Sequence, residues 1–509
     1  MPRKIESFLL NIFWAGLIVF LPVTSLPLLS KVVGGSMVAP ASALPLLVLM
    51  SGFVPLYFWR RPQLPPQVIP LFFFILVAIA STALSFFVEF PLFREVSRSR
   101  NSLAGIITLG IGISFFLAAL LLTDSENRLA FYLKWVNIGG IIALTWAGLQ
   151  SVYWYITEGY PDWMYAIQGW ISSSGNLYVR RTTGLAFEPS WLGHQLVMFY
   201  LPYWLAASFR GFSVFGKRLW KFSAENILLA GGILILLLSL ARSALLSFSL
   251  SAGWLIILLT ARFASHLHVR FSSHKPVNSA PHASRLLKIS IWLLILTAYA
   301  GVLLAGVFLI TRLDPRMEDL FRILSNPYNP LEAANYLYFG ERVAFWVTGL
   351  QIFNHFPLVG VGLENAGYFF PEMLPPFGWT VVESHKMYYS NALPNTLSLW
   401  VRLLSETGVL GFSAFLSFLY LLWRTARLLH RHPQPLISTL ALTAQLTLLA
   451  LISEGMSVDT FAFPYYWLIF GWLLAAFILK FKPAGNGIPL QGWAAMGANG
   501  QVREVSPER

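Results

Sequence analysis

The chain repeatedly offers runs of about 20 apolar residues, and this repetition constrains its fold more than any other feature. A bilayer-spanning α-helix needs roughly 20 such residues, because the hydrocarbon core is about 30 Å thick. Of the 509 residues, 56% are hydrophobic and only 11% are charged, whereas soluble domains carry about 25% charged residues. A soluble protein of this length could not bury so much apolar surface, so the sequence predicts a membrane protein.

The apolar runs, considered with their flanking charges, predict an all-α polytopic membrane protein with about 12 transmembrane helices. The predicted spans are residues 8–30, 43–59, 68–88, 104–123, 129–157, 185–207, 225–241, 243–261, 289–311, 399–423, 436–453 and 461–479. The run at 129–157 is long enough to tilt or to project beyond the bilayer. The first run is interpreted as a retained span, because it lacks a convincing small-residue cleavage site and many spans follow it.

The basic residues support this count, because they alternate between loops as the positive-inside rule requires. With the N-terminus in the cytoplasm, every loop predicted to be inside carries at least one Lys or Arg. These residues are Arg60, Arg61, Arg128, Arg210, Lys217, Arg218, Lys221, Arg262, Arg270, Lys275, Arg285, Lys288, Arg424, Arg427, Arg431, Lys480 and Lys482. One missed span would break the alternation, so both termini are predicted in the cytoplasm of a bacterial-type inner (plasma) membrane. The net charge of +13 is thereby explained without a nucleic-acid partner.

One predicted outer loop, residues 312–398, is much longer than the others and contains Pro, Gly, Trp and Tyr. Long loops of membrane proteins are commonly functional. We therefore expect a membrane domain over 1–311, an extracytoplasmic subdomain over 312–398, a second membrane domain over 399–482 and a disordered cytoplasmic tail over 483–509. The chemistry is expected on the outer face.

Several arginines lie on the predicted outer side, where they have no use in fixing orientation. They are Arg94, Arg98, Arg100, Arg180, Arg181, Arg242, Arg312, Arg316, Arg322 and Arg342. Any single one of them could simply pair with anionic lipid headgroups. Arg242 differs, because it interrupts a nearly unbroken apolar run, and intramembrane charges are functional candidates by default. Since the guanidinium fork suits phosphate oxygens, these arginines suggest a site for a lipid-linked diphosphate.

Four motifs resemble those of the bacterial O-antigen ligase and O-antigen polymerase family of membrane glycosyltransferases, over roughly residues 175–415. They are an R-x-x-x-L element at 242–246, an R-x-x-x-W…P-h-h-G-h-G signature at 342–362, an E-x-G-h-h-G element at 406–411 and an R-x-x-G-h-h-x-E-P-S element at 181–190. The third element is expected to open the span after the large loop. The last is more typical of polymerases than of ligases.

The chain departs from the ligase pattern at one position. Ligases of the family carry a His, followed by Asn, Ser or Gln, at the spacing from Gly408 that here falls on Leu397 and Ser398. The nearest substitutes are His385 and Asn395. This departure favours a polymerase or a divergent relative.

The resemblance implies a GT-C-like enzyme that transfers a glycan from undecaprenyl diphosphate to a sugar hydroxyl, with inversion and without a metal or other cofactor. As a polymerase it would join lipid-linked repeat units into a surface polysaccharide, with a chain-length regulator as a further partner. As a ligase it would move the finished glycan to lipid A core or another acceptor, in lipopolysaccharide synthesis for example.

This reaction needs groups that stabilise the departing diphosphate, groups that act on the acceptor hydroxyl and groups that bind the glycan. The departing diphosphate would be stabilised by Arg242, Arg342 and one of Arg180 or Arg181. The acceptor hydroxyl needs a general base or a positioning hydrogen-bond acceptor, and the candidates for the base are Glu188, His385, Glu383 and Glu406. Three of them have a plainer interpretation: a helix-start carboxylate for Glu188, an incidental loop histidine for His385, and an ion pair with Arg402 for Glu406. Glycan contacts are expected from Trp379, Tyr388 and Asn395, although the aromatic pair could equally anchor the loop at the interface.

Other classes fit less well. The chain has no cysteine, which excludes thiolate chemistry and Cys-ligated metals. The histidines at 266, 268, 274 and 282 fall in a predicted cytoplasmic loop rich in Arg and Lys, so they are interpreted as part of a solvated basic loop. A transporter or flippase for the lipid-linked sugar would be expected to show two related halves. No repeat is evident, and the loop 312–398 breaks any symmetry.

Overall fold

The computed structural model describes residues 3–32, 38–60, 64–216, 218–272, 339–381 and 393–481, with single positions between 290 and 308 and between 384 and 389. Most of the predicted ninth span at 289–311, the first part of the large outer loop and the predicted tail at 483–509 lie outside the described residues. The boundaries of the predicted domains are therefore not tested here.

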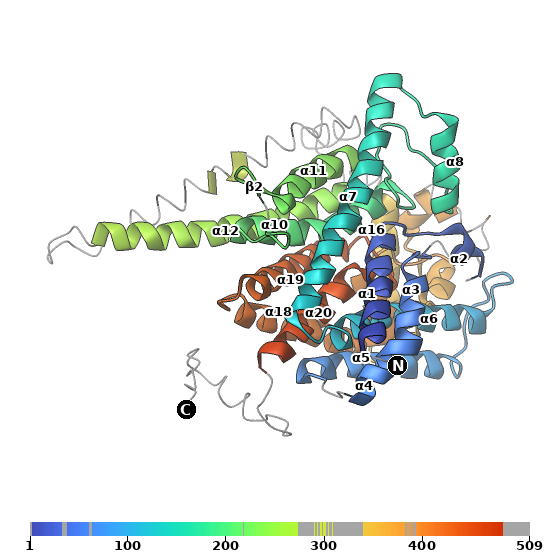
Figure 1. Cartoon of the computed structure of the whole chain (residues 1–509). Coiled ribbons are helices and arrows are strands. Elements are labelled where there is room, and N and C mark those ends of the chain that lie inside the picture. The colour runs from blue at the N-terminus through green and yellow to red at the C-terminus, as the bar shows by residue number, and fades with distance from the viewer. Residues whose placement is uncertain are drawn as a thin grey trace.

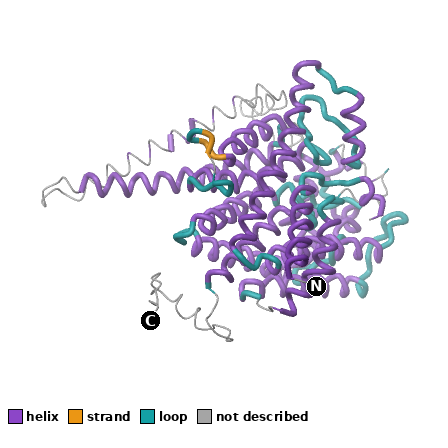
Figure 2. Tube along the Cα trace, viewed as in Figure 1, coloured by secondary structure: helices purple, strands orange, loops and turns teal. Residues whose placement is uncertain are grey.

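The described residues are almost entirely helical, with one two-stranded antiparallel pair (Figures 1 and 2). The first half contains α1 Arg3–Phe20, α2 Pro27–Val32, α3 Ala43–Val48, η1 Leu49–Phe53, α4 Val54–Arg60, η2 Pro66–Val68, α5 Ile69–Ser85, α6 Arg98–Leu121, α7 Glu126–Thr157, α8 Asp162–Ile171, α9 Pro189–Gln195, η3 Leu196–Tyr200 and α10 Leu201–Arg210. The second half contains β1 Arg218–Leu219, β2 Phe222–Ser223, α11 Ala224–Ser239, α12 Arg242–Ser272, α16 Gly340–His355, η5 Ala366–Phe369, α17 Phe370–Met373, η6 Pro376–Thr380, α18 Leu399–Leu429, α19 Pro435–Glu454 and α20 Pro464–Lys480.

Seven helical stretches in the described part of the chain are long and apolar enough to cross a bilayer. They are Ala43–Arg60, Pro66–Ser85, Arg98–Leu121, Glu126–Thr157, Arg242–Thr260, Leu399–Leu429 and Pro435–Glu454. Large apolar side chains such as Ile69, Leu76 and Leu234 remain more than half exposed on the bundle surface, as expected where lipid tails replace water. The predicted all-α polytopic membrane fold is confirmed.

Helix α20 forms the centre of the bundle. Its side chains from Tyr465 to Ala476 are all buried, so this helix is apolar on every face and shielded by its neighbours. It packs most extensively against α6, where Gly112 and Gly471 let the two backbones approach closely. Small residues at such crossings are typical of helices that pack inside membranes.

Prolines explain where the helices depart from the expected spans. The first span was expected over 8–30, and this is wrong: α1 ends at Phe20. Pro22 disfavours helical backbone at the preceding residue, and a short helix restarts at Pro27. Pro55 and Pro202 instead follow wide π-type turns, η1 and η3, which accommodate a residue that lacks an N–H donor.

Two further expectations are corrected. Residues 98–103, expected in an outer loop, already belong to α6, which begins at Arg98. The E-x-G element does not open the span after the large loop, because α18 begins at Leu399 and the element lies inside it. The long run at 129–157 does form one 32-residue helix, α7, against whose second half α8 packs through Trp146 and Trp163 (Figure 1).

Candidate active site

Two of the sequence motifs form a single backbone module. The segment Pro357–Gly362 runs alongside α18 where that helix breaks: Val361 N donates to Ser405 O at 3.0 Å, and Gly362 N donates to Glu406 O at 2.9 Å. In the other direction, Val409 N donates to Pro357 O at 2.8 Å. The groups left without helical partners at the break are thus satisfied by the neighbouring segment, as buried backbone requires.

The glycines of both motifs are needed for this close approach. Gly408 has φ 62° and ψ −169°, a conformation that is essentially restricted to glycine. A Cβ on Gly408 would lie 2.5 Å from Val359 N and would overlap the carbonyl of Leu358. Gly360, with φ +70°, faces the backbone of Glu406 in the same way. The spacing of the motifs therefore encodes a broken helix.

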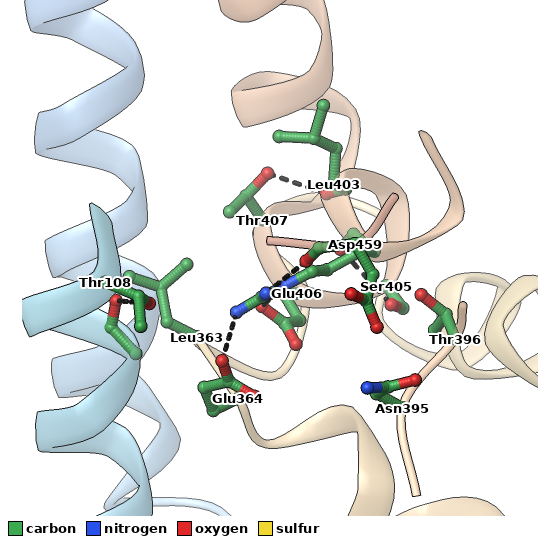
Figure 3. A network of polar contacts seen from close by, with 12 residues as sticks. Thr108, Leu363, Glu364, Asn395, Thr396, Leu403, Ser405, Glu406, Thr407 and Asp459 are labelled. Atoms are coloured by element: carbon green, nitrogen blue, oxygen red, sulfur yellow. Dashed lines mark hydrogen bonds and ion pairs between the residues drawn. The ribbon is translucent and has the colours of Figure 1, made fainter. Parts of the chain in front are cut away.

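A buried charge network lies beside this break (Figure 3). Arg402 Nε donates to Glu406 Oε2 at 2.9 Å, and its Nη2 donates to Glu364 Oε1 at 2.8 Å. Its Nη1 donates to the backbone oxygen of Asp459, and the guanidinium lies 5.1 Å from the Phe461 ring centroid. Three separate segments are thus tied to one arginine.

Arg342, on α16, contacts the same region from another side. Its Nη1 donates to Leu397 O at 3.1 Å and to Ser457 O at 3.3 Å. Burial raises the pKa of the Asp459 carboxyl above its usual range, an effect opposed by the nearby Arg402 and Arg342 and reinforced by Glu364. The segment 455–463, which joins α19 to α20, therefore carries a carboxylate between two arginines.

A second group gathers where α9 and α12 begin. Arg181 Nε donates to Ser239 O at 3.4 Å, three residues before Arg242, the first residue of α12. Glu188 is the N-cap residue of α9 and accepts a hydrogen bond from Ser190 Oγ. Burial raises the pKa of Tyr178, which Glu188 raises further and Arg181 lowers, so the charges of Arg181 and Glu188 both act on this tyrosine.

A buried histidine and carboxylate connect α9, α12 and α19. His194 Nδ1 contacts Glu454 Oε2, and Ser247 Oγ donates to Glu454 Oε1 at 2.7 Å. The side chains of His194 and Glu454 are 4% and 0% exposed, so this pair is desolvated. A carboxylate there costs free energy unless it is hydrogen-bonded, as it is here.

The segment 455–463 links the two charged groups. At one end Phe463 packs on Trp191 of α9, with ring centroids 4.9 Å apart. In the middle, Ser457 and Asp459 contact Arg342 and Arg402 through their backbone oxygens. The ends of α9, α12, α18, α19 and α20 therefore meet around this segment.

Residues 227–416 match the family model described as O-antigen ligase. This part of the chain is therefore similar to O-antigen ligases. The resemblance of the sequence motifs is thereby confirmed, and the match supports glycan transfer of the O-antigen ligase type. A search among curated proteins finds no match.

The matched residues 227–416 include Arg242, Arg342 and the module around Gly408. The element 181–190, the pair His194–Glu454 and the segment 455–463 lie outside the matched residues but pack against them. The network of Figure 3 is therefore completed by parts of the chain beyond the match.

Four further predicted site residues lie in the described part of the chain. His385 is exposed, and its Nε2 contacts the backbone oxygen of Trp379 at 2.8 Å. Trp379 is half-buried in the packing of the outer segment. Asn395 is exposed and accepts from Leu397 N at 3.2 Å. Arg180 is exposed with φ 57°. Glu383, Tyr388, Arg312, Arg316 and Arg322 lie outside the described residues.

The side-chain contacts of Glu406 and Arg98 bear on two interpretations made from the sequence. The expected ion pair of Glu406 with Arg402 is confirmed. Arg98, for which lipid pairing was considered, donates to the backbone oxygens of Ser85 and Val88 at the end of α5. It therefore helps to cap that helix, as basic side chains commonly do. In the described residues, no three His, Asp or Glu side chains are grouped to hold a metal ion.

Sequence reasoning missed His194, Glu454, Asp459 and the Glu364–Arg402 pair. The available signal was the charge itself: Glu454 and Asp459 follow a long apolar run, and His194 interrupts another. Ionisable residues inside apolar runs are functional candidates, but only the fold shows that these come together.

Proposed function

We propose that the protein is a glycosyltransferase of the bacterial inner membrane that polymerises undecaprenyl-diphosphate-linked repeat units into a surface polysaccharide on the outer face. The observation that carries the proposal is the link between two arginine groups: Arg181 donates to Ser239 O, just before Arg242, and Arg342 donates to Ser457 O. The segment 455–463 connects them, because its Phe463 packs on Trp191 of α9. Helix N-termini and arginines together favour a diphosphate. The match to the O-antigen ligase model supports the same chemistry.

In this proposal the donor diphosphate binds Arg242, Arg342 and Arg181 or Arg180. Negative charge grows on the diphosphate as the glycosidic bond to it breaks, and preorganised guanidinium groups stabilise that charge. The acceptor hydroxyl attacks the anomeric carbon from the opposite face, so the configuration inverts. Glu188 and His385 position the acceptor by accepting hydrogen bonds from its hydroxyls, and Trp379, Tyr388 and Asn395 contact the glycan. Glu406 acts through Arg402, which it holds in place.

The lipid tail needs an apolar surface within reach of the carrier. A cavity of about 220 Å³ lies between the segment Leu84–Val88, where α5 ends, and the segment Phe356–Val361. Its walls are almost wholly apolar. Because it lies at the end of α16 opposite Arg342, we propose that it accommodates isoprene units of the carrier farther from the diphosphate.

Polymerisation is preferred because the element 181–190 packs at Ser239, beside Arg242, and because position 397 is not histidine. Ligation of the finished glycan to lipid A core or another acceptor is the second candidate, favoured by the description of the matched family model. Deleting the gene and sizing the glycans separates the two. Single lipid-linked repeat units are expected; full-length polymer accumulating on the carrier would instead establish a ligase.

The arginine proposal is tested by Arg242→Ala in the deletion host. Loss of one such group typically lowers the rate by about 10²–10³-fold, so polymer should nearly vanish while membrane protein levels stay normal. Arg427→Ala, an exposed arginine near the opposite end of α18, serves as the control and should make normal polymer. A normally inserted Arg242→Ala protein with full polymer output would refute the proposal. Purified protein that leaves the lipid-linked donor intact but moves it across vesicles would indicate a flippase.

A further inference from the structure

The cluster of His194, Glu454 and Ser247 is buried but has no role in the function proposed so far. It joins three helices, since His194 lies on α9, Ser247 on α12 and Glu454 at the end of α19. A structural contact between these helices could be made by apolar side chains at lower cost, because burying an ion pair is often no better than hydrophobic packing. The presence of ionisable groups here therefore calls for a chemical explanation.

The hydrogen bonds fix the state of the imidazole. Glu454 accepts from Ser247 through one oxygen and contacts His194 Nδ1 through the other. An ionised carboxylate can only accept, so Nδ1 carries the proton and Nε2 presents its lone pair. Nε2 has no hydrogen-bond partner among the described residues. A carboxylate that orients a histidine in this way prepares it to accept a proton.

The pair lies next to the proposed diphosphate site. Gly193, the neighbour of His194, is packed so closely that a Cβ there would lie 2.8 Å from Ala241 and 2.7 Å from Ala244. These two residues flank Arg242. The ring of His194 also lies 6.3 Å from that of Phe463 at the end of the segment 455–463. His194 therefore lies between the start of α12 at Arg242 and the segment 455–463.

We propose that His194 is the general base for the acceptor hydroxyl and that Glu454 is its positioning residue. This inference rests on the proposed glycan transfer. The acceptor O–H gives its proton to Nε2 as the oxygen forms its bond to the anomeric carbon. The bond from that carbon to the diphosphate breaks, and its electron pair leaves with the diphosphate. The imidazolium formed is stabilised by Glu454 and afterwards releases the proton to water.

The test measures transfer by purified full-length protein in nanodiscs with a lipid-linked repeat unit. His194→Ala should lower kcat by about 10²–10⁴-fold, the usual contribution of a general base, with little change in KM. Added imidazole should restore part of the rate. Glu454→Gln should also lower kcat strongly, because its amide donates to Nδ1 and moves the ring proton to Nε2, where it blocks proton acceptance.

One control completes the design. His432→Ala alters a histidine in the turn beyond α18 and should have no effect, with or without imidazole.

Three outcomes separate the possibilities. Wild-type kcat in His194→Ala would overturn the inference and leave glycan transfer intact. A His194→Ala protein that melts at a lower temperature, loses activity in parallel and is not rescued by imidazole would also overturn the inference, because His194 would then have a structural role. Absence of transfer by the wild-type protein would instead overturn the proposed function. Failure of the proposed function is thus distinguished from failure of the His194 inference.

Discussion

Arg402 shows how one residue can organise a site without contacting a substrate. Its guanidinium satisfies Glu406 and Glu364 and also holds the backbone of Asp459. Glu406 is 5% exposed and Glu364 is 29% exposed. Without the arginine, Glu364 could still be hydrated, whereas Glu406 would be left as an unpaired buried carboxylate.

We predict that Arg402→Ala destabilises the protein by about 3–5 kcal/mol, the usual cost of breaking a buried ion pair by removing one partner. The double change Arg402→Met with Glu406→Gln should lose clearly less, because the buried charge of Glu406 is removed together with its partner. Thermal unfolding in nanodiscs measures both. Arg424→Ala, an exposed arginine on the same helix, is the matched control and should melt like the wild type. If the double variant melted below the single one, the charge of Glu406 would not be the cause.

At the scale of elements, the break in α18 is the feature on which the site depends. The helix runs from Leu399 to Leu429 but is interrupted at Gly408, where the segment Pro357–Gly362 supplies the missing hydrogen bonds. The break places Arg402 and Glu406 on a half-helix separate from the rest of the span. Broken helices inside membranes are tolerated only where protein or a cavity satisfies the backbone.

Gly408→Ala is predicted to destabilise the protein by at least about 1–3 kcal/mol, the cost of a strained backbone conformation, and to lower transfer activity as the motif segment is displaced. Gly110→Ala on α6 is the control, because no atom lies within 4 Å of its added Cβ. That change should leave the melting temperature unchanged or slightly raised, since alanine favours helix. Equal behaviour of the two variants would mean that the break can be closed without cost.

The sequence predicted elements better than their meeting points. Apolar runs identified most helices, and motif spacing identified both halves of the module at 357–362 and 406–411. Hydropathy did not predict that the two halves pair, because pairing depends on backbone hydrogen bonds between distant segments. Hydropathy also missed the end of α1 at Phe20, where Pro22 disfavours continuation of the helix within an apolar run. The pair His194–Glu454 could not be predicted, since 260 residues separate its members.

Across the whole molecule, charged side chains gather at two opposite sets of helix ends. Loops predicted outside meet around Arg342, Glu454 and Arg181. Loops predicted inside also meet one another: Lys480 pairs with Glu126, Arg60 pairs with Glu6, and Arg210 donates to the backbone of His430. No contact among these joins one set to the other. The grouping agrees with the alternation of basic loops.

Cysteine labelling assigns the faces, because the chain contains no cysteine of its own. Asn176→Cys and Glu372→Cys, both at exposed positions of the predicted outer set, should react with a membrane-impermeant maleimide in intact spheroplasts. Lys221→Cys and Arg431→Cys, exposed in the opposite set, should react only after lysis. Undecaprenyl-diphosphate-linked repeat units can meet Arg242 outside the cytoplasm only if this pattern holds. The reverse pattern would put the arginines on the cytoplasmic face and remove the basis for outer-face polymerisation, even if the buried chemistry of His194 and Glu454 were correct.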